Sequence, residues 1–120
     1  MKTSRNDIER DRKQTMCFES STIGYSTYKL RYGDLFMYKE TYTDGTSKWR
    51  LAKCHGRIRP NYKTSGRRDW LILAQAMSDN ATFTYERWIG SEDVMEITPK
   101  EKANKHILAF FQEQEELNYS

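Results

Sequence analysis

Apolar and polar residues alternate through most of the middle of the chain, which is the pattern of β-strands. The expected strands cover residues 35–42, 48–59, 70–77, 82–89 and 94–97. Residues 70–77 are apolar at both alternating positions, which is typical of a central strand covered on both faces. The core of the fold is therefore expected to be a β-sheet.

Turn signals separate these segments. Asp44-Gly45 lies between the first two expected strands, and Asp-Gly favours the positive φ angles of a tight hairpin turn. Pro60 followed by residues 61–69 predicts a loop, and residues 90–93 predict a short turn or 3₁₀ step before the last strand. Short connections of this kind predict antiparallel neighbours.

A helix is expected at the C-terminal end. Thr98, Pro99 and Glu101 form a capping box with proline at the first helical position. Apolar residues follow at helical spacing: Ala103, Ile107, Phe110, Phe111 and Leu117. This pattern predicts a helix over residues 98–118 that packs on the sheet and turns its Gln/Glu-rich face to water.

The length of 120 residues fits one domain. Residues 1–15 hold one large aliphatic residue, Ile8, among many charges, and predict a flexible charged arm. Residues 16–97 are expected to form a small β-barrel domain, capped by the helix over residues 98–118. The expected fold class is mostly β, or α+β.

The order of the elements resembles an SH3-like small barrel of about five antiparallel strands. The resemblance is carried by Gly33-Asp34 before the first strand, by the hairpin turn at residues 44–45 and by residues 88–94. It spans residues 33–97 and rests on strand order, not on a family motif. An OB-like barrel capped by a helix is the alternative fold.

Bulk properties indicate a cytoplasmic protein. The longest apolar run, residues 70–74, is far shorter than the roughly 20 residues of a membrane span, so no membrane partner is expected. Residues 1–7 are followed by no apolar stretch of the kind found in secretory signals. Cys17 and Cys54 form no CxxC pair, so reduced thiols are expected and a zinc site is not.

Charge is distributed unevenly around a net value of +3. Residues 48–68, here called the basic block, contain eight Lys/Arg and no Asp/Glu, whereas residues 69–120 contain four Lys/Arg and ten Asp/Glu. Such polarity predicts an acidic partner for the basic block. It also predicts salt-sensitive self-association, with the basic block of one copy against the acidic helix of another.

Within the basic block, the apolar residues change from odd-numbered to even-numbered positions. Trp49 and Leu51 share one strand face and Ala52 shares the other with Cys54, so a β-bulge is expected near Leu51 and Ala52. Beyond it, cationic residues recur at every second position and continue into the following loop. The predicted nucleic-acid-binding residues are Lys53, His55, Arg57, Arg59, Lys63, Arg67 and Arg68, and the candidate stacking rings are Tyr62 and Trp70.

Three interpretations of this basic row stay open. The first is a surface that tracks nucleic-acid phosphates with little sequence specificity. The second is an edge strand whose cations prevent edge-to-edge pairing. The third is internal neutralisation by Glu113, Glu115 and Glu116 of the C-terminal helix.

Tyrosines supply an alternative function. Tyr and Arg are enriched at protein interfaces, so the chain could instead be a small adaptor or inhibitor that binds a protein. The candidate interface residues are Tyr25, Tyr28, Tyr32, Tyr38 and Tyr42.

Motifs for catalysis are missing from the sequence. Cys54 and His55 are neighbours on a strand and point to opposite faces, and no glycine-rich phosphate loop occurs. We therefore expect a non-catalytic binding module without cofactor, metal or catalytic residues. The alternative is a nuclease-like activity that uses His55, Arg57 and Glu86.

Overall fold

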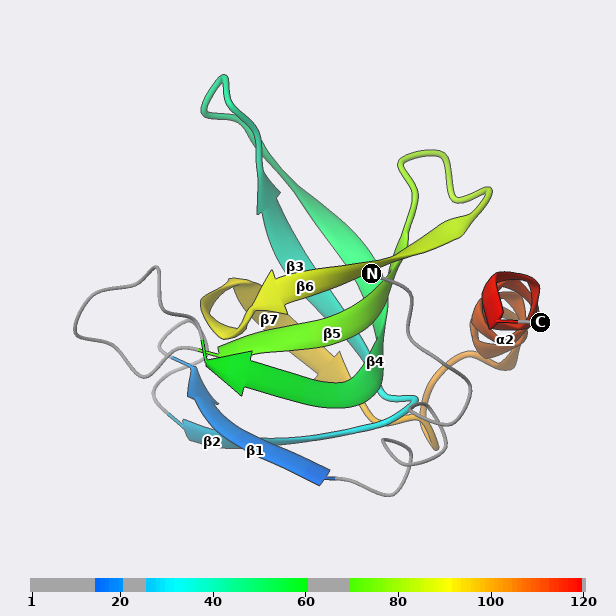
Figure 1. Cartoon of the computed structure of the whole chain (residues 1–120), viewed down its shortest axis with the longest axis horizontal. Helices are drawn as coiled ribbons and strands as arrows, with labels where there is room; N and C mark the ends of the chain where they lie inside the picture. Colours follow the sequence, from blue (N-terminus) through cyan, green and yellow to red (C-terminus); the bar gives the residue numbers. More distant parts are fainter. Residues whose placement is uncertain (1–14, 21–25, 61–69, 120) are drawn as a thin grey trace.

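The computed structural model of the chain describes residues 15–20, 26–60 and 70–119 (Figure 1). The predicted arm up to residue 14 lies outside them, as do Tyr25, Tyr62, Lys63, Arg67 and Arg68. The described elements are β1 (Thr15–Ser20), β2 (Ser26–Arg31), β3 (Leu35–Thr41), β4 (Ser47–Pro60), β5 (Trp70–Met77), β6 (Thr84–Gly90), the 3₁₀ helix η2 (Ser91–Asp93), β7 (Val94–Thr98) and α2 (Lys105–Tyr119).

Five strands form one antiparallel sheet in the order β6-β5-β4-β3-β7, and β1 pairs with β2 in a second sheet of two strands. The mostly β prediction, with one C-terminal helix, is confirmed. Closure of the sheet into a barrel is not confirmed, because β6 and β7 lie at opposite edges of the five-stranded sheet. In the described part of the chain, no helix is both long and apolar enough to cross a membrane.

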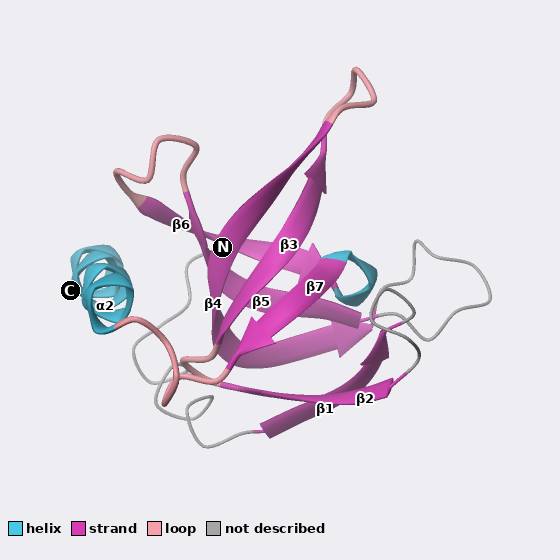
Figure 2. Ribbon diagram, turned by 180° about the vertical axis from the view of Figure 1, so that it is seen from behind, coloured by secondary structure: helices cyan, strands magenta, loops and turns pink. Residues whose placement is uncertain are grey.

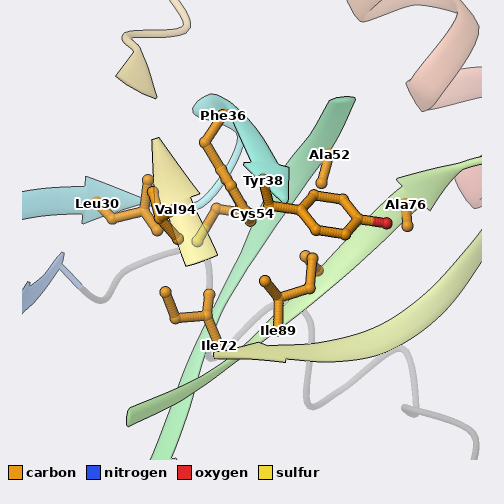
Figure 3. Packing of buried hydrophobic residues seen from close by; sticks show 10 residues of the cluster. Leu30, Phe36, Tyr38, Ala52, Cys54, Ile72, Ala76, Ile89 and Val94 are labelled. Atoms are coloured by element: carbon orange, nitrogen blue, oxygen red, sulfur yellow. The ribbon is translucent and has the colours of Figure 1, made fainter. Parts of the chain in front are cut away.

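One face of the sheet forms the hydrophobic core. Side chains from β3, β4, β5, β6 and β7 meet there, and β2 adds Leu30, which is fully buried. In Figure 3, Leu30 and Val94 lie at one end of this cluster, and the Tyr38 ring extends toward Ala76 at the other. The small residues Ala52, Cys54, Ala74 and Ala76 line the neighbouring strands β4 and β5, which leaves room for the larger rings.

The hairpin predicted at Asp44-Gly45 is confirmed and projects beyond the rest of the sheet (Figure 2). Gly45 has a φ of 88°, a value that favours glycine. The Asp44 carboxylate accepts hydrogen bonds from the Thr46 amide, at 2.9 Å, and from its hydroxyl, at 2.6 Å. The turn is therefore held by its own side chains.

The bulge predicted near Leu51 and Ala52 is placed wrongly. The β3–β4 register runs without interruption from Leu35↔Lys53 to Thr41↔Ser47. The irregularity lies instead between Cys54 and Ile58 in the β4–β5 pairing, where Gly56 has a φ of 77°. The apolar residues Trp49 and Ala52 lie on opposite faces without a bulge between them, because Trp49 is not a core residue: 52% of its surface is exposed.

The C-terminal helix begins at Lys105, later than the predicted start at Thr98. Thr98 ends β7, and Glu101 does not close a capping box but pairs with Arg31 at 2.6 Å. Hydrogen bonds from Arg31 lower the pKa of Glu101 to about 2. Asn104 is the observed cap, since its side-chain oxygen accepts hydrogen bonds from the amides of His106 and Ile107.

Replacement of Asn104 by alanine is expected to lower the free energy of unfolding by about 1 kcal/mol, the usual cost of losing an N-cap. Thr98→Val is the control, because it removes the hydroxyl of the rejected cap but keeps the branched shape that suits β7; its expected cost is within about 0.5 kcal/mol. Urea unfolding followed by circular dichroism measures both. A larger loss for Thr98→Val would contradict the observed helix start.

Candidate functional site

Lys53, His55, Arg57 and Arg59 of β4 are here called the basic row. The row lies on the sheet face opposite the core and has a covered and an exposed part. Lys53 pairs with Gln75 and Arg59 with Leu71 across the β4–β5 ladder, so both point to the same face. Lys53 and His55 are buried, whereas Arg57 is half-buried and Arg59 is exposed. The predicted continuous basic surface is therefore interrupted at its N-terminal half.

Arg59 forms the exposed part together with Trp88 of β6. Its guanidinium carbon lies 4.3 Å from the centre of the half-buried Trp88 ring. The β5–β6 register places Trp88 opposite Leu73, on the same face of the sheet as Leu71. This cation–π contact holds the guanidinium over the indole, and the Arg59 side chain stays exposed to a ligand.

Lys53 forms the covered part together with the C-terminal helix. Its ammonium group donates a hydrogen bond to the Glu115 carboxylate of α2, and the Tyr32 hydroxyl donates to the other carboxylate oxygen. Side-chain exposure is 5% for Lys53 and 4% for Glu115. Burial acts to raise the pKa of Glu115, but the charge and hydrogen bond of Lys53 outweigh it, so this pKa is lowered.

His55 lies beside this ion pair and is completely buried. Its Nε2 atom is 3.3 Å from the side-chain oxygen of Gln75, and its ring stacks on Tyr32 with centres 5.7 Å apart. Burial lowers the pKa of His55 below its ordinary value, although the charge of Glu115 opposes the shift. The third interpretation, neutralisation of the basic row by the helix, therefore holds for Lys53. Among the three helix acids considered, Glu115 is the one that pairs with it.

Arg50, a further cation of the basic block, is also paired internally. It points to the core side of β4, where its guanidinium contacts Glu40 and Asp79. Arg87 of β6 reaches the other Glu40 oxygen at 2.7 Å. Burial acts to raise the pKa of Glu40, but hydrogen bonds from Arg87 and Arg50 outweigh it and lower the pKa. Arg50 is thus a structural cation.

The candidate aromatic residues are spread over several environments. Tyr32 and Tyr38 are buried, so they do not form an exposed interface, and Tyr42 is half-buried with its hydroxyl near Arg50. Tyr28 lies in β2 opposite Phe18. Trp70 is half-buried at the start of β5, where its amide donates to the Ser91 hydroxyl at 3.0 Å.

Trp88 was not predicted as the partner of Arg59, and Glu115 was named only together with Glu113 and Glu116 as an acid that faces the basic row. One signal was available for Glu115: it follows the fully buried Phe111 by four residues and therefore lies on the same helix face. Leu117 was expected in the core stripe but is 68% exposed. The inward face of α2 thus carries the Glu115 carboxylate, whereas Leu117 points outward.

The described residues hold no cluster of three or more His, Cys, Asp or Glu side chains that could bind a metal ion. His55, the residue proposed for the nuclease alternative, is enclosed by Tyr32 and Gln75 beneath α2. Comparison of the chain with family models, with curated proteins and with solved structures found no match.

Proposed function

We propose that the chain is a non-catalytic, cytoplasmic module that binds nucleic acid through its phosphates, using the exposed end of β4. The observation that carries this proposal is Arg59, exposed and stacked on Trp88 at 4.3 Å. A guanidinium donates to phosphate oxygens in a fixed planar fork, and its plane also accepts a stacked base. Both contacts are independent of base identity, so sequence specificity is low.

The residues after Arg59 support the same partner. The chain continues from β4 into a segment that carries Lys63, Arg67 and Arg68 and no acid before Asp69. Each phosphate that such cations neutralise releases condensed counterions, which makes binding favourable and salt-dependent. The proposed contact residues are therefore Arg57, Arg59, Lys63, Arg67 and Arg68, without Lys53 and His55, which are covered in this structure.

The fold that we propose for this module is an SH3-like small barrel. Support comes from the sheet order β6-β5-β4-β3-β7, in which the last strand lies beside the first strand of the sheet. The short helix η2 directly before β7 fits the same arrangement. Folds of this kind have many functions, so the fold alone does not identify the ligand.

Arg59→Ala tests the proposed function. We expect it to weaken binding of a fluorescein-labelled oligothymidylate about five-fold and to reduce the slope of log affinity against log salt by about 0.7, the value for one phosphate contact on a single strand. Lys48→Ala is the matched control, because Lys48 is an exposed cation of the same strand at its hairpin end. Equal effects of the two substitutions on anisotropy titrations would refute a localised site.

A protein partner is the second candidate function, and two exposed rings favour it. Trp49 of β4 and Phe83, just before β6, each expose 52% of their surface, and aromatic side chains are enriched at protein interfaces. Purification of the native protein at low salt separates the two candidates. Nucleic acid bound to the protein raises the ratio of absorbance at 260 nm to that at 280 nm, and a protein partner does not.

A further inference from the structure

The covered half of the basic row has the geometry of an anion site that is already filled. Lys53 and Tyr32 both donate to one carboxylate, that of Glu115. A phosphate oxygen is an acceptor of the same kind and the same charge sign. The register of β4 against β5 puts this site and Arg59 on one face of the sheet, so α2 lies over the continuation of the proposed binding surface.

The contacts that hold α2 on this face combine apolar side chains with one hydrogen bond and one ion pair. Phe111 is its one fully buried apolar residue among those described, and Ile107, Leu108 and Phe110 are half-buried. The Gln75 side chain donates a hydrogen bond to the Phe111 carbonyl at 2.8 Å, and the Lys53–Glu115 pair holds the next turn. Figure 1 shows the helix standing at one side of the sheet, joined to β7 by residues 99–104.

A buried ion pair contributes little net stability, because the cost of removing both charges from water is close to the gain from their attraction. Replacement of the Glu115 carboxylate by a phosphate as the partner of Lys53 therefore requires little free energy. A helix of this length is also marginal when isolated in water, so α2 depends on this docking to stay in place.

We propose that Lys53 and Tyr32 form a second phosphate site for nucleic acid and that the Glu115 carboxylate of α2 competes for it. The helix is then an internal competitor: a strand of nucleic acid bound at Arg59 displaces the Glu115 turn of α2 and places its next phosphates on Lys53. This inference rests on the proposed function, and it adds a contact that the resting structure conceals.

The test compares Glu115→Gln with Glu113→Gln in the full-length chain. Both substitutions remove one negative charge from α2, but Glu113 is exposed and has no part in the Lys53 contact. We expect Glu115→Gln to bind a fluorescein-labelled oligothymidylate about ten-fold more tightly, within the usual range of coupling between sites. Its slope of log affinity against log salt should steepen by about 0.7, for one added phosphate contact. Glu113→Gln should change affinity less than about two-fold.

A second measurement uses the wild-type chain and so does not depend on how the variant folds. Addition of saturating oligothymidylate should increase hydrogen exchange at the amides of α2 around Glu115. If the wild type binds through Arg59 but these amides stay protected, or if the two variants bind equally, the competition is refuted and the proposed function stands. If neither the wild type nor either variant binds the oligonucleotide, both proposals are refuted.

Discussion

Replacement of Lys53 by methionine is expected to lower the free energy of unfolding by about 3 kcal/mol. The reason is the carboxylate left behind: Glu115 would keep the Tyr32 hydrogen bond but lose the ammonium group that compensates its buried charge. The decrease in the free energy of unfolding is limited because α2 can detach from the sheet, which would return the Glu115 carboxylate to water. Urea unfolding at neutral pH measures the effect, and circular dichroism reports whether the helix is retained.

The triple variant Lys53→Met/Glu115→Leu/Tyr32→Phe separates the ion pair from simple packing. It removes both charges and also the Tyr32 hydroxyl that would lose its acceptor, and it fills the site with apolar atoms, so stability should return to within about 1 kcal/mol of the wild type. Lys48→Met, at an exposed position of the same strand, should change stability by less than about 0.5 kcal/mol. If Lys53→Met is as mild as Lys48→Met, the contact with Glu115 does not hold the helix.

Stability should also fall as the pH drops below about 6.5, the ordinary pKa of histidine. Burial lowers the pKa of His55 in the folded chain, so the unfolded chain binds a proton that the folded chain excludes. The contribution of His55 is therefore complete above that pH and is lost below it, by up to about 1.4 kcal/mol per pH unit. The lowered pKa of Glu115 adds a further loss below about pH 4.3.

Burial sets this response, and three charged groups modify it: Glu115 of α2 and Glu86 of β6 oppose the lowering of the His55 pKa, whereas Lys53 of β4 adds to it. His55→Gln keeps a hydrogen-bonding side chain beside Gln75 but cannot take up a proton, so its stability should be nearly constant between pH 7 and about pH 5. His106→Gln, at an exposed position of α2, should follow the wild type. The same pH dependence in His55→Gln would show that another group is responsible.

Strands were predictable because their signals are local. The alternation in residues 35–41 and the turn residues Asp44-Gly45 act on the backbone where they occur. The pair β1–β2 was missed, since its register depends on contacts between the two strands and not on a strong pattern in either. The helix start was wrong for a related reason: Arg31, distant in sequence, takes the Glu101 side chain that a capping box would use.

The candidate site was predictable only in part. Alternating cations predicted the row on β4, and the acidic C-terminal segment indicated neutralisation by the helix, but strand spacing alone does not show which cations that helix covers. That depends on the tertiary contact between Glu115 and Lys53, residues far apart in the chain. Trp88 had no sequence signal as the partner of Arg59, because the register of β6 against β5 places it there.

Gly56 lies where β4 departs from a regular strand, and its φ of 77° is one that favours glycine. The irregularity between Cys54 and Ile58 separates the buried Lys53 from the exposed Arg59, and side chains in strands alternate between two faces. Loss or gain of one residue at this point would reverse the faces of Ile58 and Arg59 relative to Lys53. Such a change would turn the Arg59 guanidinium toward the core cluster, against which Ile58 now packs, and would expose Ile58 to water, so the irregularity fixes which face of β4 carries the charge.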